Sequence, residues 1–354
     1  MSVTEADVLK HLSKVADPEL GRDIVSLGMV KDVKIDGGVL DFTFELTTAA
    51  CPIREKFEGD VRKAAEAIPG VREVRMKVTA RPAATGRIGA MIPGVRNVIA
   101  IASGKGGVGK STVTANLALA LAKAGTRVGL MDADVYGPSI PIMFGITKEK
   151  PVGVGDKITP IERYGIKIIS AGFFIAEGEA LIWRGPMLAG IVKQFLTDVA
   201  WGELDYLLVD LPPGTGDVQL TLSQMIPLTG SVIVSTPQDV ALNVAAKAIY
   251  MFQKLNVPIL GVIENMAYFN CPHCHERTEI FGAGGARKAA DRAGYVFLGE
   301  VPLDVEVREA GDRGKPIVLS NPDSALAKTF TQVAFNMAGQ VSVRNLSTEE
   351  IKVG

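Results

Sequence analysis

The chain has 354 residues, of which 47% are hydrophobic and 22% are charged, and its formal net charge is -1. This length and apolar content suffice for a large core and predict two domains. The balanced charge offers no electrostatic footprint for nucleic acid, so we expect no such partner. Charged residues interrupt the region after Met1 and the longest helical apolar run, which argues against a signal peptide and against a membrane-spanning helix. Three cysteines form no closed disulfide framework, which favours a reducing cytoplasm.

Residues 1–78 are predicted to form a small α/β domain with the element order α-β-β-α-β. A helix is expected after Thr4, which is a favoured N-cap residue, and a second helix from about Ile53 to Ile68. Alternating apolar and polar residues predict three strands, at Met29–Ile35, Val39–Leu46 and Val71–Val78.

Residues 79–95 contain Pro, Gly, Ala and Arg without any period, so we expect a mobile linker there. In residues 96–340, strand-like apolar runs alternate with helical segments. This alternation predicts a doubly wound, mostly parallel α/β sheet with helices on both faces. Residues 341–354 are expected to be a C-terminal tail. The expected strands lie at Val98, Val128, Ile166–Ile169, Tyr206–Val209, Val232–Val234 and Ile259–Ile263.

A phosphate-binding loop of the Walker A type follows the first of these strands. It consists of Gly104-Lys105-Gly106-Gly107-Val108-Gly109-Lys110-Ser111, with Thr112 next in the helical pattern. The glycines permit positive φ and leave space, so that backbone amides can converge on the phosphates of ATP at a helix N-terminus. Lys110 is expected to neutralise the β and γ phosphates, and the Ser111 hydroxyl to bind Mg²⁺. A plain glycine turn does not explain a lysine and a serine in this register.

Acidic residues end two further strands, where ligands bind in an open α/β sheet. Asp210 has the Walker B position, at which a carboxylate holds the Mg²⁺ shell through water. Asp132 is expected to support the loop or the metal shell, and Asp134 follows two residues later. A turn or helix-capping role is the alternative for each aspartate. Gly214 and Gly216 predict a switch segment that moves when the γ phosphate leaves.

Cys271-Pro272-His273-Cys274 lies after the strand Ile259–Ile263, on the nucleotide side of the sheet. Two thiolates at this spacing can bind one soft metal centre, whereas a cubane iron–sulfur cluster and a structural zinc each need four ligands. A symmetric dimer would double the pair and complete a site on the two-fold axis. His273 and His275 keep zinc open as the metal, and a redox pair or an inert turn is a further alternative.

The loop sequence G-K-G-G-V-G-K-S resembles the deviant Walker A ATPases, which include the nitrogenase iron protein, the septum-site and plasmid-partition ATPases and the iron–sulfur carrier ATPases. The resemblance implies that Lys105 crosses a two-fold interface to the partner's nucleotide, as an arginine finger does in trans. It implies that Asp134 orients the attacking water. It also implies that Asn265 reads the adenine edge, with a buried asparagine that satisfies backbone groups as the alternative.

Five further motifs are D-A-D-V-Y-G-P-S at Asp132–Ser139, W-R-G-P-M at Trp183–Met187, D-L-P-P-G-T-G-D at Asp210–Asp217, T-P-Q-D-V-A at Thr236–Ala241, and E-N-M at Glu264–Met266. Together with the C-P-H-C segment, they resemble the Mrp/ApbC iron–sulfur cluster carrier ATPases over about residues 97–336. The resemblance implies a cytoplasmic, homodimeric, Mg-dependent ATPase in which Cys271 and Cys274 bind an iron–sulfur cluster of the 4Fe–4S type. The cluster would pass from scaffold donors to recipient apoproteins.

The N-terminal segment resembles small metal–sulfur cluster biosynthesis domains, through D-P-E-L at Asp17–Leu20, S-L-G-M-V at Ser26–Val30 and L-T-T-A-A-C-P at Leu46–Pro52. Cys51 would open a helix, whose dipole favours the thiolate, and is expected to be a transfer thiol. A packing role is the alternative.

Two other functions stay open from the sequence: a septum- or partition-type spatial regulator, and a zinc-stabilised nucleotide-binding scaffold. The C-terminal helical stripe lacks the basic amphipathic character of a lipid-binding tail, so no membrane partner is expected.

Overall fold

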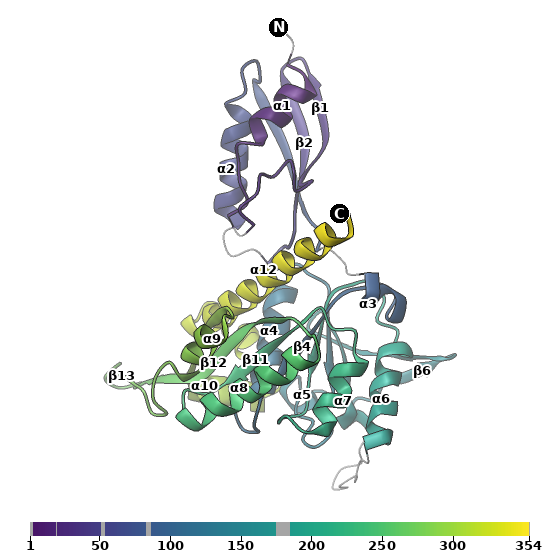
Figure 1. Cartoon of the computed structure of the whole chain (residues 1–354), viewed down its shortest axis with the longest axis vertical. Coiled ribbons are helices and arrows are strands. Elements are labelled where there is room, and N and C mark those ends of the chain that lie inside the picture. Colours follow the sequence, from purple (N-terminus) through teal and green to yellow (C-terminus); the bar gives the residue numbers. More distant parts are fainter. Residues whose placement is uncertain (1–2, 19, 51–53, 83–85, 175–184, 354) are drawn as a thin grey trace. The chain divides into compact units, whose positions relative to one another are not determined.

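The computed structural model describes residues 3–18, 20–50, 54–82, 86–174 and 185–353. The chain divides into two compact units, one of Met1–Ala83 with Ser342–Gly354 and the other of Ala84–Val341. Figure 1 shows their elements in sequence colours.

The small unit has the predicted element order α-β-β-α-β. The Thr4 hydroxyl accepts a hydrogen bond from the Asp7 amide and so caps the first helix. Strands β1 and β2 pair antiparallel, and β2 and β3 pair parallel. Alternate residues of β2, including Phe42 and Phe44, are buried in the core together with Phe57 of the second helix. The elements are α1 (Glu5–Leu12), β1 (Val30–Asp36), β2 (Val39–Leu46), α2 (Arg54–Glu66) and β3 (Glu73–Ala80).

The large unit contains a nine-stranded, mostly parallel sheet, as the sequence predicted. Its strands follow the order β13-β12-β11-β4-β10-β5-β9-β8, with β14 also paired to β12. Strands β8 and β13 pair antiparallel to their neighbours. The strands are β4 (Val95–Ala102), β5 (Val128–Asp132), β8 (Ile161–Arg163), β9 (Ile166–Ser170), β10 (Leu204–Asp210), β11 (Gly230–Ser235), β12 (Ile259–Asn270), β13 (Arg277–Thr278) and β14 (Phe297–Leu303), and a separate hairpin is formed by β6 (Val152–Val154) and β7 (Lys157–Thr159).

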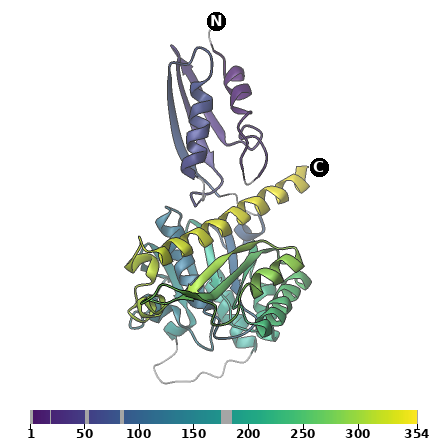
Figure 2. The same cartoon turned by 90° about the vertical axis from the view of Figure 1, so that its left-hand side faces the viewer.

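Helices connect the strands and cover the sheet, as Figures 1 and 2 show. Every residue of β5, β10 and β11 is buried, which requires cover on both faces of the sheet. The last helix packs on β14, where a Cβ at Gly299 would lie 2.7 Å from Val333. The helices are α3 (Gly86–Met91), α4 (Lys110–Lys123), α5 (Ile140–Met143), a 3-10 turn (Ala171–Phe174), α6 (Gly185–Thr197), α7 (Asp217–Met225), α8 (Asp239–Lys254), α9 (Gly285–Ala293), α10 (Val305–Asp312), α11 (Ile317–Ser320) and α12 (Ala325–Val353).

Two segments differ from the sequence prediction. The expected linker at 79–95 contains the end of β3, the helix α3 and the first residue of β4. Ile88 and Ile92 lie four residues apart and are both buried, so the segment has an apolar helical face that its Gly, Pro and Ala content conceals. The expected tail at 341–354 is wrong as a separate segment, because α12 continues through it to Val353.

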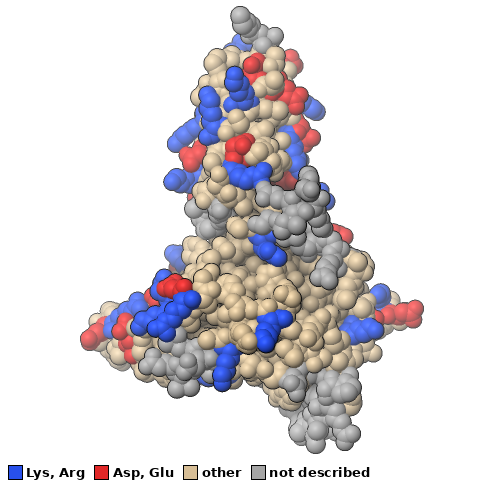
Figure 3. All heavy atoms as spheres, viewed as in Figure 1, with Lys and Arg blue, Asp and Glu red and all other residues tan. Residues whose placement is uncertain are grey.

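The surface of the molecule carries charges of both signs. On the face in Figure 3, Lys and Arg side chains are interspersed with Asp and Glu, and wide areas of the large unit carry neither. Among the described helices, none combines the length and the apolar character needed to cross a membrane.

Candidate functional site

The phosphate-binding loop leaves the carboxyl end of β4, which lies between β10 and β11 in the sheet. After β4 the chain runs to β5, which lies on the β10 side of β4. After β10 it runs to β11, which lies on the opposite side of β4. Such a switch of direction opens a crevice at the strand ends, where nucleotides bind in doubly wound sheets. The predicted loop therefore lies at the position that this fold offers to a ligand.

The loop uses its glycines in different ways. Gly107 and Gly109 both have φ of 77°, in the left-handed region, and Gly109 is the N-cap of α4. Gly106 does not adopt positive φ. A Cβ at Gly109 would overlap with Nδ2 of Asn265, whereas one at Gly107 would meet nothing within 4 Å. Gly109 is thus required for both conformation and space.

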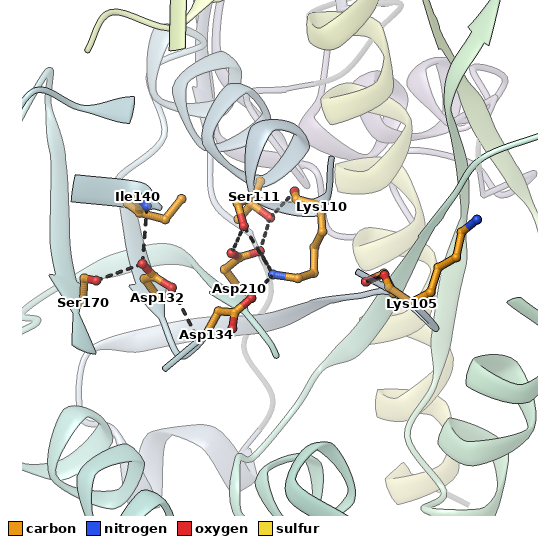
Figure 4. A network of polar contacts seen from close by, with 10 residues as sticks. Lys105, Lys110, Ser111, Asp132, Asp134, Ile140, Ser170 and Asp210 are labelled. Atoms are coloured by element: carbon orange, nitrogen blue, oxygen red, sulfur yellow. Dashed lines mark hydrogen bonds and ion pairs between the residues drawn. The ribbon is translucent and has the colours of Figure 1, made fainter. Parts of the chain in front are cut away.

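Lys110, Ser111 and Asp210 point toward one another at the start of α4 (Figure 4). Lys110 Nζ lies 2.8 Å from Asp210 Oδ1, and the Ser111 hydroxyl donates to Asp210 Oδ2 at 2.5 Å. Thr114, one turn later, donates to Oδ1 at 2.7 Å. Asp210 has no solvent exposure and Lys110 only 5%. The predicted Walker A and Walker B groups are therefore in direct contact.

Asp134 lies on the other side of Lys110. Its Oδ2 is 3.6 Å from Lys110 Nζ, and its Oδ1 is buried without a hydrogen-bond partner among the described residues. Burial raises the pKa of Asp134, the nearby Lys110 opposes that rise, and the negative charge of Asp210 adds to it. An acceptor oxygen without a donor, aimed from a strand end beside the lysine, is available to a water molecule or a cation.

Asp132 serves the loop after β5 rather than the phosphate-binding loop. It accepts hydrogen bonds from the Ser170 hydroxyl at 2.8 Å and from the amides of Asp134 and Ile140. Complete burial, together with the charge of Asp210, raises the pKa of Asp132 to about 8. Through its hydrogen bonds, Asp132 supports the segment that carries Asp134.

These groups fit a magnesium ion. Mg²⁺ prefers hard oxygen ligands, and the Ser111 hydroxyl and the Asp210 carboxylate supply them side by side. Asp134 and Asp210 both lie within ion-pair distance of the single ammonium group of Lys110, so the acidic groups there outnumber the cations. A divalent cation would balance that excess.

Lys105 points away from this cluster, as Figure 4 shows. Its ammonium group donates to the side chain of Gln238 at 2.8 Å, and its carbonyl accepts from the Ser103 hydroxyl. Gln238 is the N-cap residue of α8. The side chain of Lys105 is thus turned from the phosphate loop of its own chain.

Asn265 contacts the phosphate-binding loop. Its amide Nδ2 donates to the Val108 carbonyl at 2.8 Å, and the residue is 6% exposed. This is the backbone-satisfying role that the sequence left as an alternative to adenine recognition. Glu264 beside it accepts from the amides of Gly284 and Ala286 and so holds the start of α9.

The two cysteines occupy a hairpin turn between β12 and β13. The turn is closed by hydrogen bonds from the Cys271 amide to the Glu276 carbonyl at 3.0 Å and from the His275 amide to the Cys271 carbonyl at 2.8 Å. Both thiols are free, and Cys274 is exposed. Hydrogen bonds from the Cys274 and His273 amides and from the Cys274 thiol lower the pKa of Cys271.

This turn therefore favours a thiolate at Cys271, the form that binds metals. Within the described part of the chain, no three His, Cys, Asp or Glu side chains gather into one metal site.

Other predicted residues lie partly outside the described residues. Cys51 does, as do Trp183 and the residue after it in the W-R-G-P-M motif. Gly214, in the predicted switch, has φ of 102° and donates its amide to the Ser103 carbonyl at 2.9 Å. The Thr112 carbonyl accepts from Asn116 within α4.

Sequence reasoning missed Thr114 and Ser170, which complete the cluster. Thr114 stands four residues after Lys110, so helical periodicity places it on the same face of α4. Ser170 pairs in register with Asp132 at the end of β9. The rule that ligand-facing residues follow the strand ends would have found it.

Comparison with known proteins places this geometry in a family. Residues 94–338 match the family described as "NUBPL iron-transfer P-loop NTPase", and residues 5–78 match "Iron-sulfur cluster assembly protein". An iron–sulfur cluster carrier protein of Deinococcus radiodurans is 52% identical over 341 residues, covering 96% of each chain. The chain belongs to the iron–sulfur cluster carrier family of P-loop NTPases. A second carrier, from Synechocystis, is 48% identical and covers 98% of this chain and 100% of its own length.

Solved structures agree with the fold of this carrier-family chain. A nucleotide-binding protein of Archaeoglobus fulgidus, in complex with ADP, is 45% identical with a TM-score of 0.58, covering 65% of this chain and 90% of its own. The cell division ATPase MinD of Pyrococcus furiosus has a TM-score of 0.52 at 24% identity, covering 68% and 97%. The latter likeness shows the fold alone.

Proposed function

We propose that this protein is an ATP-dependent iron–sulfur cluster carrier that works as a homodimer. In this proposal, each subunit binds and hydrolyses one ATP, and the two subunits together bind one cluster of the 4Fe–4S type through Cys271 and Cys274. The cluster is cargo, received from a scaffold donor and passed to an apoprotein. We expect the exchange to take place in the cytoplasm. The observation that carries the proposal is the open cysteine hairpin on β12, the strand that also contacts the phosphate-binding loop.

ATP binding is supported by the loop geometry. Two glycines in the left-handed region and the N-terminus of α4 present backbone amides to a phosphate, and Lys110 adds a positive charge. The related protein of Archaeoglobus fulgidus was solved with ADP. We infer that the phosphates lie along this loop and replace part of the contact between Lys110 and Asp210.

In the proposed ATP hydrolysis, each of the three aspartates has a distinct role. Ser111 and Asp210 would hold Mg²⁺, Asp210 through water, and the ion would neutralise charge on the phosphates. Asp134 has the unpartnered Oδ1 that a water molecule would occupy, so we infer that it orients the attacking water. Asp132 keeps the loop after β5 in place and thereby positions Asp134.

The orientation of Lys105 is evidence for the proposed dimer. The Lys105 side chain is turned from the phosphate loop of its own subunit, so we assign it no catalytic role there. It nevertheless lies next to the nucleotide site. Across a two-fold axis it would reach the partner's phosphates and stabilise the charge of the transition state.

The ligand count supports the same assembly. A cubane cluster takes four thiolates and each chain offers two at the hairpin, so two subunits supply the set. The exposure of Cys274 suits a cluster that must be handed on. Cys51 is a candidate transfer thiol in this scheme.

Anaerobic reconstitution tests the proposal. The protein is supplied with ferrous iron and sulfide, and iron, sulfide and zinc are measured together with the visible absorption and the molecular mass. The expected result is a dimer with a broad visible band, about four irons, and transfer of the cluster to the apo form of a 4Fe–4S enzyme. A colourless protein with stoichiometric zinc would instead favour the zinc-stabilised scaffold. A protein that stays monomeric with both ATP and iron–sulfur precursors contradicts the bridged site.

A further inference from the structure

One hydrogen bond joins β12 to the back of the phosphate-binding loop. Asn265 Nδ2 donates to the Val108 carbonyl at 2.8 Å, and both residues are buried. In a trans peptide unit, the carbonyl of one residue and the N–H of the next point in opposite directions. Asn265 therefore fixes the orientation of the peptide whose other end, the Gly109 N–H, faces the side on which a phosphate would bind.

The contact is tight enough to transmit a displacement. A Cβ at Gly109 would overlap with Nδ2 of Asn265, and the same Cβ would lie 3.5 Å from the terminal carbon of Met266. The side chains of Asn265 and Met266 thus pack directly against this turn of the loop. A rotation of the peptide between Val108 and Gly109 must therefore move Asn265 or break its hydrogen bond.

The backbone of β12 departs from extended geometry at the next residue. Met266 has φ of 56°, a left-handed conformation that is strained for a non-glycine residue and that clusters at functional positions. Pairing with β11 ends at Glu264, and the register against β14 shifts between Asn265 and Phe269. Beyond this point the strand loses its pairing with β11, and Phe269 pairs instead with Thr278 of β13 and Leu303 of β14.

The outer part of β12 leads directly to the cysteines. From Asn265 to Cys271 the strand covers about 20 Å at the usual rise per residue. Its last residues, Phe269 and Asn270, pair with β13 and so form one hairpin with the turn that holds Cys271 and Cys274. A change of direction at Met266 would move this hairpin relative to β14, to which Phe269 pairs through Leu303.

We propose that the hydrogen bond from Asn265 to Val108 couples the phosphate-binding loop to the cysteine hairpin. Asn265 is then a positioning residue: phosphate binding at the Gly109 N–H reorients the peptide, Asn265 follows, and the hairpin shifts about Met266. Coupling of this kind is reciprocal, so a metal on the thiols changes the affinity for nucleotide by the same factor. This inference rests on the proposed function, for which it supplies a link between ATP and the cluster.

Thiol labelling tests the coupling without any cluster. In a Cys51→Ser background, a chromogenic disulfide reports the reaction rate of Cys271 and Cys274 with and without saturating MgATP. We expect MgATP to change this rate about fivefold, which is at the lower end of coupling between sites. Asn265→Ala, saturated with MgATP as verified by a fluorescent ATP analogue, should lose the change. Asn265→Asp, which keeps the size but removes the donating amide, gives the same test if the alanine variant does not fold.

Asn336→Ala is the matched control. Asn336 also donates its Nδ2 to a backbone carbonyl at 2.8 Å, that of Leu298 on β14, but has no contact with the phosphate-binding loop. This variant should respond to MgATP as the wild type does. A wild-type response that persists in nucleotide-saturated Asn265→Ala overturns the coupling, as does a wild type whose labelling rate ignores MgATP. If Asn265→Ala loses only its preference for ATP over GTP and keeps the labelling response, the role of Asn265 is adenine recognition. That result also overturns the coupling. If labelling responds but reconstitution yields no cluster, the carrier function fails and the coupling stands.

Discussion

Lys110 and Asp210 form a buried ion pair, with Nζ 2.8 Å from Oδ1. The pair joins the phosphate-binding loop to the end of β10, and the hydroxyls of Ser111 and Thr114 donate to the same carboxylate. A phosphate that binds to Lys110 would have to share it with Asp210. The lysine therefore has a structural partner as well as a ligand, and its loss has two consequences.

Lys110→Ala should abolish ATP hydrolysis and also destabilise the large unit. A charge-assisted contact to the phosphate is lost, and Asp210 is left as a buried carboxylate without its cation, which typically costs about 3–5 kcal/mol. Phosphate release and urea denaturation measure the two effects. The double variant Lys110→Met with Asp210→Asn removes both charges and should recover much of the stability but no activity. Hydrolysis at the wild-type rate in Lys110→Ala would refute the loop assignment.

Gly109→Ala should weaken nucleotide binding and stability more than Gly107→Ala does. Both glycines have φ of 77°, so alanine is strained by about 1–2 kcal/mol at either position. Only at Gly109 does the new methyl group also overlap with Asn265. Titration with a fluorescent ATP analogue and urea denaturation compare the pair. Equal losses in the two variants would mean that the contact with Asn265 has no energetic weight.

The sequence predicted the parts of the site that are local patterns. The glycine–lysine–serine loop and the aspartates at the strand ends are read from short segments, and the structure brings Lys110 and Asp210 together as expected. Asn265 was identified through the family resemblance, but its partner Val108 lies 157 positions away, and no local sequence pattern spans that separation. The helix α3 was missed for a different reason, because two buried isoleucines in a segment rich in Gly and Pro give too weak a period.

Lys105→Ala should bind ATP with nearly unchanged affinity and hydrolyse it about a thousandfold more slowly, as when an arginine finger is removed. The reason is that Lys105 turns away from its own loop, toward Gln238, and in the proposed dimer would act on the partner's nucleotide. Gln238→Ala removes this partner within the chain and serves as the control, with activity expected near that of the wild type. Mixing Lys105→Ala with an otherwise inactive Lys110→Ala subunit should restore turnover at one site per mixed dimer. Failure of that complementation contradicts the role in trans.

Cys271→Ala and Cys274→Ala should each empty the metal site and leave nucleotide binding intact. Each variant leaves two thiolates in a dimer where a cubane cluster needs four. Iron and sulfide analysis after anaerobic reconstitution measures the loss, and titration with the ATP analogue checks the loop. His273→Ala is the matched control in the same turn, with the cluster expected to remain. A full cluster in either cysteine variant would show that the ligands lie elsewhere.

Asp205 should make stability depend on acid pH. Burial raises its pKa, but hydrogen bonds and charge from Arg127, with Nη2 2.9 Å from Oδ1, and the charge of Arg96 outweigh burial and lower the pKa below its usual 3.8. Since the folded state favours the carboxylate, its contribution is present above pH 3.8 and is lost as pH falls toward the lower folded value. Asp205→Asn should therefore cost about 1.5–3 kcal/mol at neutral pH, and the difference from wild type should shrink in acid. Urea denaturation across pH measures this difference in the free energy of unfolding. Asp312→Asn, which removes an exposed ion pair with Arg308, is the control and should cost at most about 0.5 kcal/mol. A difference that is independent of pH would exclude this carboxylate as the source.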